Sequence, residues 1–438
     1  MLAHITPSPL AGEIDAIASK SVAHRLIIIG ALANGPVHIS CSTTCADIDA
    51  TVRCLESLGA TVQRTQDGFD IKPTLKSNAL GLLKALHGAT LDCGESGSTL
   101  RFMLPIACAL GAEATLTGST RLFERPLSPL SDQIVQAGAS LERAGANALR
   151  TAGRMRPGRF ELAGNVSSQF ISGLLMAAPL LDGPSQVIVY GEVESRPYIN
   201  LTIQAMRTYG VSVVVEHSIM EDGRPATVFT PQGTGYQTPH TADVEGDWSN
   251  AAFWLCAGAM GTEPVTVGGL SLSSAQGDRT IMAVLSRFGA RMGRTPTSAI
   301  ARPDKLVGFA MSAKDIPDLV PIIAAVASVA EGTTTISDCG RLRIKESDRL
   351  ATVQQELSRL GAHIAIEGDS LVIEGVERLE GGTVSSHNDH RIAMMAAIAA
   401  TRCEGPVTIQ GAEATAKSYP DFFEHYRALG GIVELTEE

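Results

Sequence analysis

The feature that most constrains the fold of this chain is a short motif that occurs six times at nearly even spacing. In each copy an amphipathic helix ends in an aromatic or aliphatic residue, and a glycine, a small residue and a strand follow. The glycines are 79, 72, 79, 72 and 69 residues apart, at Gly59, Gly138, Gly210, Gly289, Gly361 and Gly430. Glycine suits this position because the residue after a helix often takes a left-handed conformation. Six copies at a near-constant period predict a repeated fold.

A second helix, apolar on all sides, precedes the amphipathic helix in every copy and is followed by a β-rich strand. A helix without a polar face is buried, and the strand after it is expected to cover it. Each copy is therefore predicted to have the order β-α-β-α-β-β over about 73 residues. The apolar helices are predicted over 21–33, 98–110, 169–181, 249–259, 319–330 and 390–401.

The six copies divide into two halves of three. The join at 233–243 is rich in Gly, Thr and Pro, which is typical of a crossover. The sequence predicts an α/β (α+β) protein with one three-repeat domain at 20–240 and a second at 241–438, and hinges near 19–20 and 240. Residues 1–19 have strand-like character and are expected to pair with the second domain. Pseudo-threefold symmetry is expected within each domain.

Composition narrows the class of protein. Hydrophobic residues make up 44% and charged residues 18%, which is typical of a globular protein. The net charge of −11 argues against a nucleic-acid or membrane-surface partner unless the cations are concentrated. The eight cysteines form no CxxC pair and no metal-ligand spacing, so buried free thiols in a reducing compartment are expected. Without a signal-peptide pattern or a membrane span, the expected location is the cytoplasm.

The apolar helices begin with an unusual set of polar residues. If three helix N-termini from each half converge, their unpaired N–H groups and dipoles form an anion site. Asp247 and Asn250 can equally be ordinary N-caps. Lys and Arg oppose the dipole at a helix N-terminus, so they need a compensating anion. Such cations stand at Lys20, Arg25, Arg101 and Arg391.

More cations stand at the starts of the amphipathic helices. Lys and Arg on a helix more often form a solvated face, but here they recur at the same edge of the repeat in an acidic chain. The pattern therefore predicts a strongly anionic small-molecule ligand. These cations are Arg121, Arg125, Arg196, Arg343, Lys345, Arg349 and Lys417.

These residues match one known family in order along essentially the whole chain. The chain resembles the 5-enolpyruvylshikimate-3-phosphate (EPSP) synthases, which are the 3-phosphoshikimate 1-carboxyvinyltransferases of the enolpyruvyl transferase family. The motifs KESDR at 345–349 and NDHR at 388–391 are individually specific. The other matching segments are Lys20-Ser21-x-x-x-Arg25, Ser96-Gly97-Ser-Thr-Leu-Arg101, Arg121-x-x-x-Arg125-Pro, Ser167-Ser168-Gln169, Ser195-Arg-Pro-Tyr198, Asp318 and Lys417.

The resemblance implies a two-domain inside-out α/β barrel built from six βαβαββ repeats. It also implies a reaction that moves the enolpyruvyl group of phosphoenolpyruvate onto the 5-hydroxyl of shikimate 3-phosphate and releases phosphate. This step belongs to the shikimate pathway, which leads to chorismate and the aromatic amino acids, and it is the target of glyphosate. No metal or organic cofactor is expected, and the working form is expected to be a monomer.

The resemblance assigns residues to each substrate. Phosphoenolpyruvate is expected at Lys20, Gly97, Arg125, Gln169, Arg349, Arg391 and Lys417. Shikimate 3-phosphate is expected at Lys20, Ser21, Arg25, Ser167, Ser168, Gln169, Ser195, Asp318 and Lys345. Each half carries mutually repelling cations, so bound anions are expected to draw the halves together and exclude water.

The expected reaction needs an acid and a base whose pKa values are separated by their environments. The resemblance implies that Glu346 is the proton donor and Asp318 the base, with Lys20 as a third catalytic group. Spacing alone instead favours Glu346 as a first-turn residue that stabilises a helix dipole, and Asp318 as an N-cap. His390 is expected to be structural.

Three positions depart from the common pattern of the family. Glu95 stands where Asn is more frequent and is expected to turn away from the phosphate. Phe102 stands where some members have Pro, and Arg341 stands where some have Asn. Gly97 is retained, which leaves room for glyphosate.

Three alternative functions remain open from the sequence. The sister enzyme that acts on UDP-N-acetylglucosamine carries Lys-Asn rather than Lys20-Ser21, and a loop cysteine that 111–125 lacks. An RNA-end-processing protein of related fold is disfavoured by the acidic charge and by the lack of interleaved aromatics. A non-catalytic relative is disfavoured because every catalytic position is filled.

Overall fold

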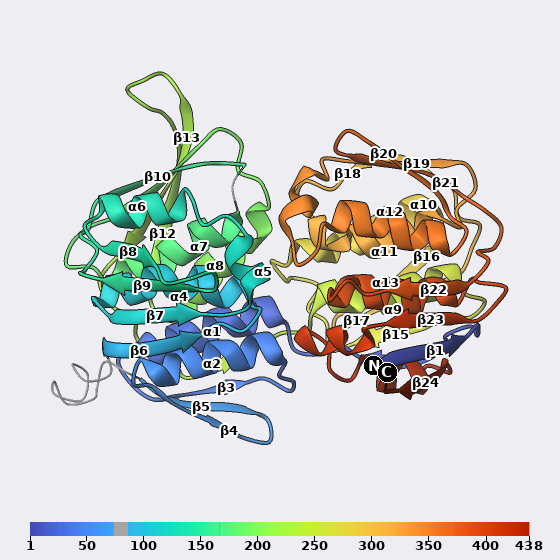
Figure 1. Ribbon diagram of the computed structural model, residues 1–438, viewed down its shortest axis with the longest axis horizontal. Helices are drawn as coiled ribbons and strands as arrows, with labels where there is room; N and C mark the ends of the chain where they lie inside the picture. Colours follow the sequence, from blue (N-terminus) through green and yellow to red (C-terminus); the bar gives the residue numbers. More distant parts are fainter. Residues whose placement is uncertain (74–85, 166, 438) are drawn as a thin grey trace. The chain divides into compact units, whose positions relative to one another are not determined.

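The computed structural model describes residues 1–73, 86–165 and 167–437. Its strands form six four-stranded sheets that share one topology. In every sheet an edge strand runs parallel to its neighbour, and the two remaining strands continue the sheet antiparallel. The six repeats predicted from the glycine spacing are confirmed by this recurring order (Figure 1).

The chain divides into two compact units, which we name by their chain composition. The continuous unit is Ala18–Val244, and the divided unit joins Met1–Ile17 to Glu245–Glu438. The changes of unit therefore fall after residues 17 and 244, whereas the sequence-based boundaries fall after 19 and 240.

The continuous unit holds three sheets with the orders β14-β3-β5-β4, β6-β7-β9-β8 and β10-β11-β13-β12. Its strands are β3 Val37–Ser40, β4 Thr61–Arg64, β5 Gly68–Lys72, β6 His87–Asp92, β7 Glu113–Thr117, β8 Ser140–Arg143, β9 Ala148–Ala152, β10 Arg159–Ala163, β11 Gln186–Tyr190, β12 Ser212–Ile219, β13 Pro225–Gln232 and β14 Ala242–Asp243. Its described helices are α1 Lys20–Leu32, α2 Ala46–Ser57, α4 Gly97–Leu110, α5 Thr120–Glu124, α6 Leu130–Gln136, α7 Ser168–Ala177, the 3-10 helix η2 Ala178–Leu180 and α8 Arg196–Thr208.

The divided unit holds the orders β16-β17-β15-β2, β18-β19-β21-β20 and β22-β23-β1-β24. Its strands are β1 Leu2–Thr6, β2 Gly12–Asp15, β15 Val265–Gly268, β16 Arg291–Thr295, β17 Ser298–Arg302, β18 Ala310–Ser312, β19 Thr333–Ser337, β20 His363–Glu367, β21 Ser370–Glu374, β22 Gly382–Ser385, β23 Val407–Gln410 and β24 Ile432–Thr436. Its helices are α9 Trp248–Met260, η3 Gly277–Thr280, α10 Ile281–Phe288, η4 Pro317–Leu319, α11 Val320–Ala327, η5 Gly340–Ile344, α12 Arg349–Arg359, α13 His390–Ala400, η6 Ala412–Lys417 and α14 Phe422–Ala428.

Strands from distant parts of the chain complete two sheets of the divided unit. β2 runs parallel to β15 at a sheet edge. β1 lies between β23 and β24 and pairs antiparallel with both. Strands β1 and β2 therefore pair with strands of the second half, whereas residues 18 and 19 belong to the continuous unit. In the continuous unit the corresponding edge strand is β14, which pairs with β3 just before the chain changes unit.

The six motif glycines take the left-handed conformation that the sequence predicts. Their φ angles lie between 80° and 116°. Side chains other than glycine rarely adopt this region. The positions of these glycines therefore mark the ends of six helices.

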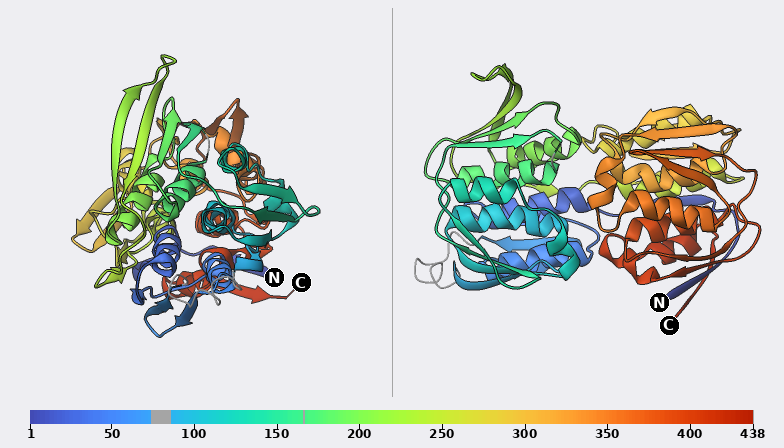
Figure 2. Two further views of the ribbon diagram at one scale, coloured as in Figure 1. Left: turned by 90° about the vertical axis from the view of Figure 1, so that its left-hand side faces the viewer. Right: turned by 45° about the horizontal axis from the view of Figure 1, so that its top comes forward.

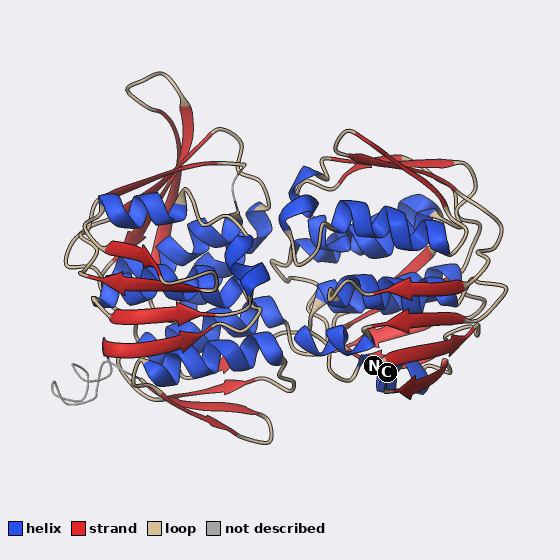
Figure 3. Cartoon of the chain, in the orientation of Figure 1, coloured by secondary structure: helices blue, strands red, loops and turns tan. Residues whose placement is uncertain are grey.

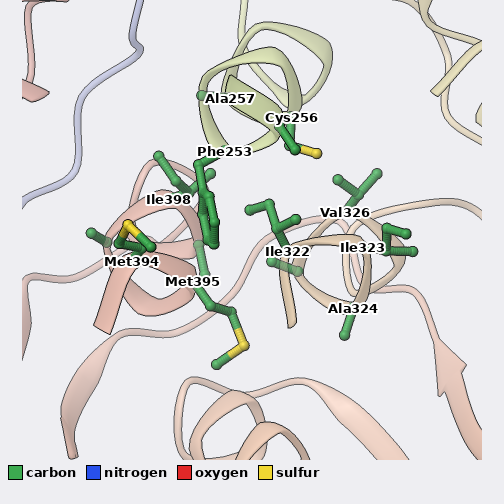
Figure 4. Close-up of a cluster of buried hydrophobic side chains, with 14 of the residues drawn as sticks. Phe253, Cys256, Ala257, Ile322, Ile323, Ala324, Val326, Met394, Met395 and Ile398 are labelled. Atoms are coloured by element: carbon green, nitrogen blue, oxygen red, sulfur yellow. The ribbon is translucent and has the colours of Figure 1, made fainter. Parts of the chain in front are cut away.

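The apolar helices form the interior of each unit, and the sheets lie outside them (Figures 2 and 3). In the divided unit α9, α11 and α13 contact one another pairwise. Phe253, Ile322 and Met395 come from these three helices and meet in one buried cluster (Figure 4). The helix predicted over 319–330 begins instead with η4, because Pro317 and Pro321 remove backbone N–H donors from its first turns.

The predicted α/β class agrees with this mixture of helices and mixed sheets. The described strands form six separate sheets and do not close into a barrel. All eight cysteines are buried free thiols, as predicted. None of the described helices combines the length and the apolar character that crossing a membrane would require.

Candidate active site

The predicted site residues fall into two groups, one in each unit. In the continuous unit they gather at the first turns of α1, α4, α7 and α8. α7 contacts both α4 and α8, and α8 contacts α1. Helix N-termini carry unpaired N–H groups and positive dipole ends, so this arrangement favours anions.

Arg25 lies buried on α1 and binds neutral acceptors on α7 and α8. Its Nε donates to Thr202 Oγ1 at 2.7 Å and its guanidinium to the backbone oxygens of Ser21 and Tyr198 at 2.6 and 3.0 Å. Burial lowers the pKa of Arg25 to about 10. The group nevertheless stays charged at neutral pH, so a buried cation lies beside Ser21.

Lys20, the first residue of α1, pairs with the carboxylate of Asp47 at 2.8 Å. Both side chains are mostly buried, with exposures of 16% and 14%. This ion pair compensates the charge that opposes the helix dipole. A substrate anion that binds Lys20 therefore has to share it with Asp47.

Gly97 allows two guanidinium groups to approach the first turn of α4. A Cβ at this position would lie 2.7 Å from Arg125 Nη1 and 3.0 Å from Arg101 Nη1. Arg101 donates to Gln169 Oε1 at 2.7 Å, and Gln169 donates to Ser98 Oγ at 2.9 Å. The structure thus joins Gly97, Arg125 and Gln169, as the resemblance implies, and adds Arg101.

Three serines stand at the helix starts of this group. Ser167 caps α7 by accepting from the backbone N–H of Gln169 at 3.3 Å, and Ser168 begins the helix. Ser195 precedes α8 in a left-handed conformation with φ of 52° and is buried. Non-glycine residues in this conformation cluster at binding sites, where surrounding contacts sustain the strain.

The hydrogen-bond chain beneath α4 was not predicted. His24 Nδ1 lies 2.8 Å from Thr51 Oγ1, which lies 2.7 Å from Thr99 Oγ1. Thr99 Oγ1 donates to Ser96 Oγ at 2.8 Å, and Ser96 caps α4. Burial, with the charges of Lys20 and Arg25, lowers the pKa of His24 well below its usual value. A neutral His24 therefore supports the Ser96–Gly97 turn, and no local pattern in the sequence marks this chain.

In the divided unit, Asp318 forms the centre of a buried ion cluster. Its Oδ1 lies 3.1 Å from Lys345 Nζ and 2.9 Å from Arg349 Nη1. Arg391 reaches Oδ2 at 3.4 Å and the backbone oxygen of Asp318 at 3.0 Å. Burial would raise the pKa of Asp318, but the charges of Lys345, Arg391 and Arg349 outweigh it and hold the pKa well below its usual value. The N-cap alternative for Asp318 is wrong, because the residue lies inside η4.

Arg349 is saturated by carboxylates. Asp389 accepts from its Nε and Nη2 at 2.8 and 3.2 Å, and Glu346 Oε2 lies 2.7 Å from Nη2. Burial would lower the pKa of Arg349, but Asp389, Glu346 and Asp318 raise it above its usual value. Glu346 precedes Asp348, the N-cap of α12, so the first-turn alternative for Glu346 is also wrong.

Two further cations belong to this group. Lys345 is mostly buried, and desolvation lowers its pKa despite the nearby carboxylate of Asp318. Lys417 ends η6 and donates to the backbone oxygen of Asn388 at 2.6 Å. The structure thus brings Asp318, Lys345, Glu346, Arg349 and Arg391 into one cluster, and places Lys417 on the turn before α13.

The cluster also contains Asp278, which sequence analysis missed. Asp278 lies buried in η3 and accepts a hydrogen bond from Ser249 Oγ in the first turn of α9. Burial, with the charge of Asp318, raises the pKa of Asp278 to about 6. Asp247 caps α9 by accepting from the backbone N–H of Asn250 at 2.8 Å, so the capping alternative is correct for Asp247.

A family model described as EPSP synthase (3-phosphoshikimate 1-carboxyvinyltransferase) matches residues 5–426. The chain belongs to the EPSP synthase family. Two curated relatives named 3-phosphoshikimate 1-carboxyvinyltransferase come from Clostridium kluyveri and the Alaska E43 strain of Clostridium botulinum. They are 39% identical over 431 residues and 40% identical over 432 residues, and each match covers 98% of this chain and 97% of the relative.

Solved structures support the same fold. An EPSP synthase from Acinetobacter baumannii matches with a TM-score of 0.78 at 24% identity, over 100% of both chains. The enolpyruvyl transferase NikO from Streptomyces tendae matches with a TM-score of 0.75 at 19% identity, over 99% of this chain and 98% of its own. The predicted two-domain α/β fold is thereby confirmed.

The positions where this EPSP synthase family member departs from the common pattern have different surroundings. Phe102 is buried, and the Arg25 guanidinium lies over its ring, 5.1 Å from the ring centre. The Phe102 ring therefore supports Arg25, which is one of the predicted substrate residues. Glu95 is exposed and Arg341 half-buried in η5. His390 is buried with its ring 3.9 Å from the Asp389 carboxylate. No group of three or more His, Cys, Asp or Glu among the described residues could hold a metal ion.

Proposed function

We propose that this chain transfers the enolpyruvyl group of phosphoenolpyruvate to the 5-hydroxyl of shikimate 3-phosphate and releases phosphate. The observation that carries the proposal is the match of an EPSP synthase family model to residues 5–426. The clustering of Asp318 and Glu346 with Lys345, Arg349 and Arg391 supports the proposal, because this reaction needs an acid, a base and anion-binding groups. We place the reaction in the cytoplasm and assign it to a monomer.

The two substrates together carry two phosphates and two carboxylates, about five to six negative charges near neutral pH. In the proposed complex, Ser21, Arg25, Ser167, Ser168 and Ser195 hold shikimate 3-phosphate from the continuous unit. Guanidinium groups suit carboxylates and phosphates because their paired N–H groups can donate to two oxygens of one anion at the same time. The remaining predicted residues of the two substrate sets complete the binding.

The proposed chemistry is an addition followed by an elimination. Glu346 gives a proton to the methylene carbon of phosphoenolpyruvate, and the cationic centre at the neighbouring carbon bonds to the 5-hydroxyl oxygen. Asp318 takes the hydroxyl proton. The Glu346 carboxylate then takes a proton back from the new methyl group, the carbon–oxygen bond to phosphate breaks as phosphate leaves, and the enolpyruvyl double bond returns.

The proposed roles of base and acid set opposite requirements on the two carboxyls, whereas the ion pairs favour the charged form of both. Asp318 is already ionised, as a base must be, but the cations around it make it a weak one. Contact with Arg349 stabilises the charged form of Glu346, whereas a proton donor must hold its proton. An incoming anion that engages Arg349 and Arg391 weakens both effects. We therefore propose that phosphoenolpyruvate itself strengthens the base and lets Glu346 accept a proton.

A phosphate-release assay with both substrates tests the proposal. Release with shikimate 3-phosphate but not with UDP-N-acetylglucosamine is expected, and the reverse result would assign the chain to the sister reaction. Asp318→Asn and Glu346→Gln should each lower kcat by roughly 10²- to 10⁴-fold, the usual contribution of a general acid or base. Full activity in either variant would remove the role given to that residue.

A further inference from the structure

A buried carboxylate on α12 holds the turn that precedes α13. Glu356 is fully buried, and its Oε2 accepts from the backbone N–H of Ser385 at 2.9 Å. Its Oε1 accepts from His387 Nε2 at 2.7 Å. Arg359, which is 48% exposed, pairs with the same carboxylate at 3.2 Å from the solvent side. Glu356 therefore joins α12 to the segment 385–389, which we call the 385–389 turn.

The backbone of the 385–389 turn is strained at two consecutive residues. His387 and Asn388 have φ angles of 51° and 55°. Non-glycine residues rarely take this conformation, and it persists only where surrounding contacts impose it. The hydroxyl oxygens of Ser385 and Ser386 accept from the backbone N–H groups of His387 and Asn388, each at 3.1 Å. The contact between His387 and Glu356 ties this strained segment to a helix.

The 385–389 turn presents groups that contact three predicted phosphoenolpyruvate residues. Its Asn388 carbonyl oxygen accepts from Lys417 at 2.6 Å. Its Asp389 carboxylate binds Arg349 at 2.8 Å and accepts from the backbone N–H of Arg391 at 3.0 Å. Lys417, Arg349 and Arg391 therefore depend on one short segment for their placement.

We propose that Glu356 is a positioning residue, which acts through His387 and the 385–389 turn to place the cations that bind phosphoenolpyruvate. The inference rests on the proposed function, because it names what this set of cations binds. The carboxylate itself touches no substrate. It fixes a conformation that the turn would not keep alone, and misplacement of a binding group by about 1 Å can cost roughly 100-fold in rate.

A positioning role and a purely structural role predict different effects on the binding of the two substrates. Most residues predicted for shikimate 3-phosphate lie in the continuous unit, away from α12 in the chain. A mobile 385–389 turn should therefore weaken phosphoenolpyruvate binding and spare shikimate 3-phosphate. General destabilisation of the protein would lower the amount of active enzyme, and hence kcat, while leaving both KM values alike.

The experiment compares Glu356→Gln and His387→Ala with Arg359→Ala as the matched control. Gln keeps the shape and the acceptor for Ser385 but binds His387 less strongly. Ala at 387 removes the His387 contact and keeps the steric cost of the left-handed conformation. We expect both test variants to raise KM for phosphoenolpyruvate by roughly 10- to 100-fold, with KM for shikimate 3-phosphate within about twofold. Arg359→Ala, which removes only the exposed partner, should match the wild type.

Turnover by the wild type tests the proposed function separately, because that measurement involves no variant. Given an active wild type, unchanged KM values in both test variants would overturn the role of Glu356, as would an equal rise for both substrates. If Glu356→Gln fails to fold, His387→Ala decides the question, since residue 387 lies on a partly exposed turn. Equilibrium binding of phosphoenolpyruvate in the presence of shikimate 3-phosphate should weaken by the same factor as KM.

Discussion

The two units surround their buried arginines with different kinds of hydrogen-bond partner. Arg25 in the continuous unit makes its hydrogen bonds to hydroxyl and backbone oxygens, and burial lowers its pKa to about 10. Arg349 in the divided unit binds three carboxylates, which raise its pKa. In the proposed complex an anion can bind Arg25 without displacing a carboxylate, whereas an anion that binds Arg349 must compete with the carboxylates already there. Anion binding should stabilise the first unit more than the second.

The largest loss of stability should come from removing Arg349 from its ion cluster. Arg349→Met leaves the buried Asp389 carboxylate uncompensated, which typically costs about 3–5 kcal/mol. Arg25→Met should cost about 1 kcal/mol or less, because it removes a buried cation that is not paired with a carboxylate. Both tryptophans, Trp248 and Trp254, lie on α9, so their fluorescence during urea unfolding reports the divided unit, and far-ultraviolet circular dichroism reports both units. Equal losses of stability in the two variants would contradict the comparison.

A measurement of stability against pH should reveal the raised pKa of Asp278 in the divided unit. Burial and Asp318 raise the pKa of Asp278 to about 6 from 3.8, so its contribution is favourable below pH 3.8 and is lost as the pH rises through 6. The loss is on the order of 3 kcal/mol. Asp278→Asn should abolish this decline between pH 4 and 7, as followed by the tryptophan transition. The depressed pKa of Asp318 acts oppositely, and its contribution disappears only well below pH 3.8. An unchanged profile in Asp278→Asn would remove Asp278 from the cluster.

Ligand-induced stabilisation should differ between the substrates. Shikimate 3-phosphate alone, at 100 times its Kd, should add about 2.7 kcal/mol to the stability of the unit that binds it. Thermal unfolding followed by circular dichroism should show this shift in the wild type but not in Arg25→Met. Phosphoenolpyruvate at the same concentration should give the smaller shift, because Arg349 and Arg391 already have carboxylate partners. A larger shift with phosphoenolpyruvate would reverse the comparison.

The smallest effect is expected at Gly97. Alanine would place its Cβ 2.7 Å from Arg125 Nη1, and the flexible end of that side chain has to move. Gly97→Ala should therefore raise KM for phosphoenolpyruvate by roughly tenfold, with little change in stability. Ser98→Ala, one residue along α4, provides a comparison that removes a hydroxyl without adding bulk near Arg125. A rise in KM for shikimate 3-phosphate instead would show that Arg125 serves the other substrate.

The fold was predictable where local signals repeat. Glycine is nearly obligatory at the six left-handed helix ends, so their spacing reveals the repeats. Strand β14 has only two residues and no pattern of its own, so it could not be predicted. The cations at helix starts were also visible in the sequence, because they oppose the dipole and need an explanation. The proline-rich start of α11 differs from prediction because missing N–H donors change the helix type locally.

The internal partners of the site were not predictable, because they come from distant elements. Asp318 and Glu346 look like helix caps until Lys345, Arg349 and Arg391 converge on them. Asp278 has an ordinary local context, and its altered pKa arises only from burial beside Asp318. Glu356 likewise resembles an exposed helical residue until the 385–389 turn folds over it. Sequence patterns thus located the cations, and tertiary contacts decided which anions neutralise them.

The placement of β1 between β23 and β24 sets an order on folding during synthesis. The continuous unit has all its strands once residue 244 has left the ribosome, so it can fold while the rest of the chain is still being made. β1 is translated long before its two partners, β23 and β24. It must stay unpaired throughout elongation, which exposes a strand edge to wrong partners. Joining β24 to β1 and opening the chain near residue 244 would give a circular permutant that makes each unit in one piece.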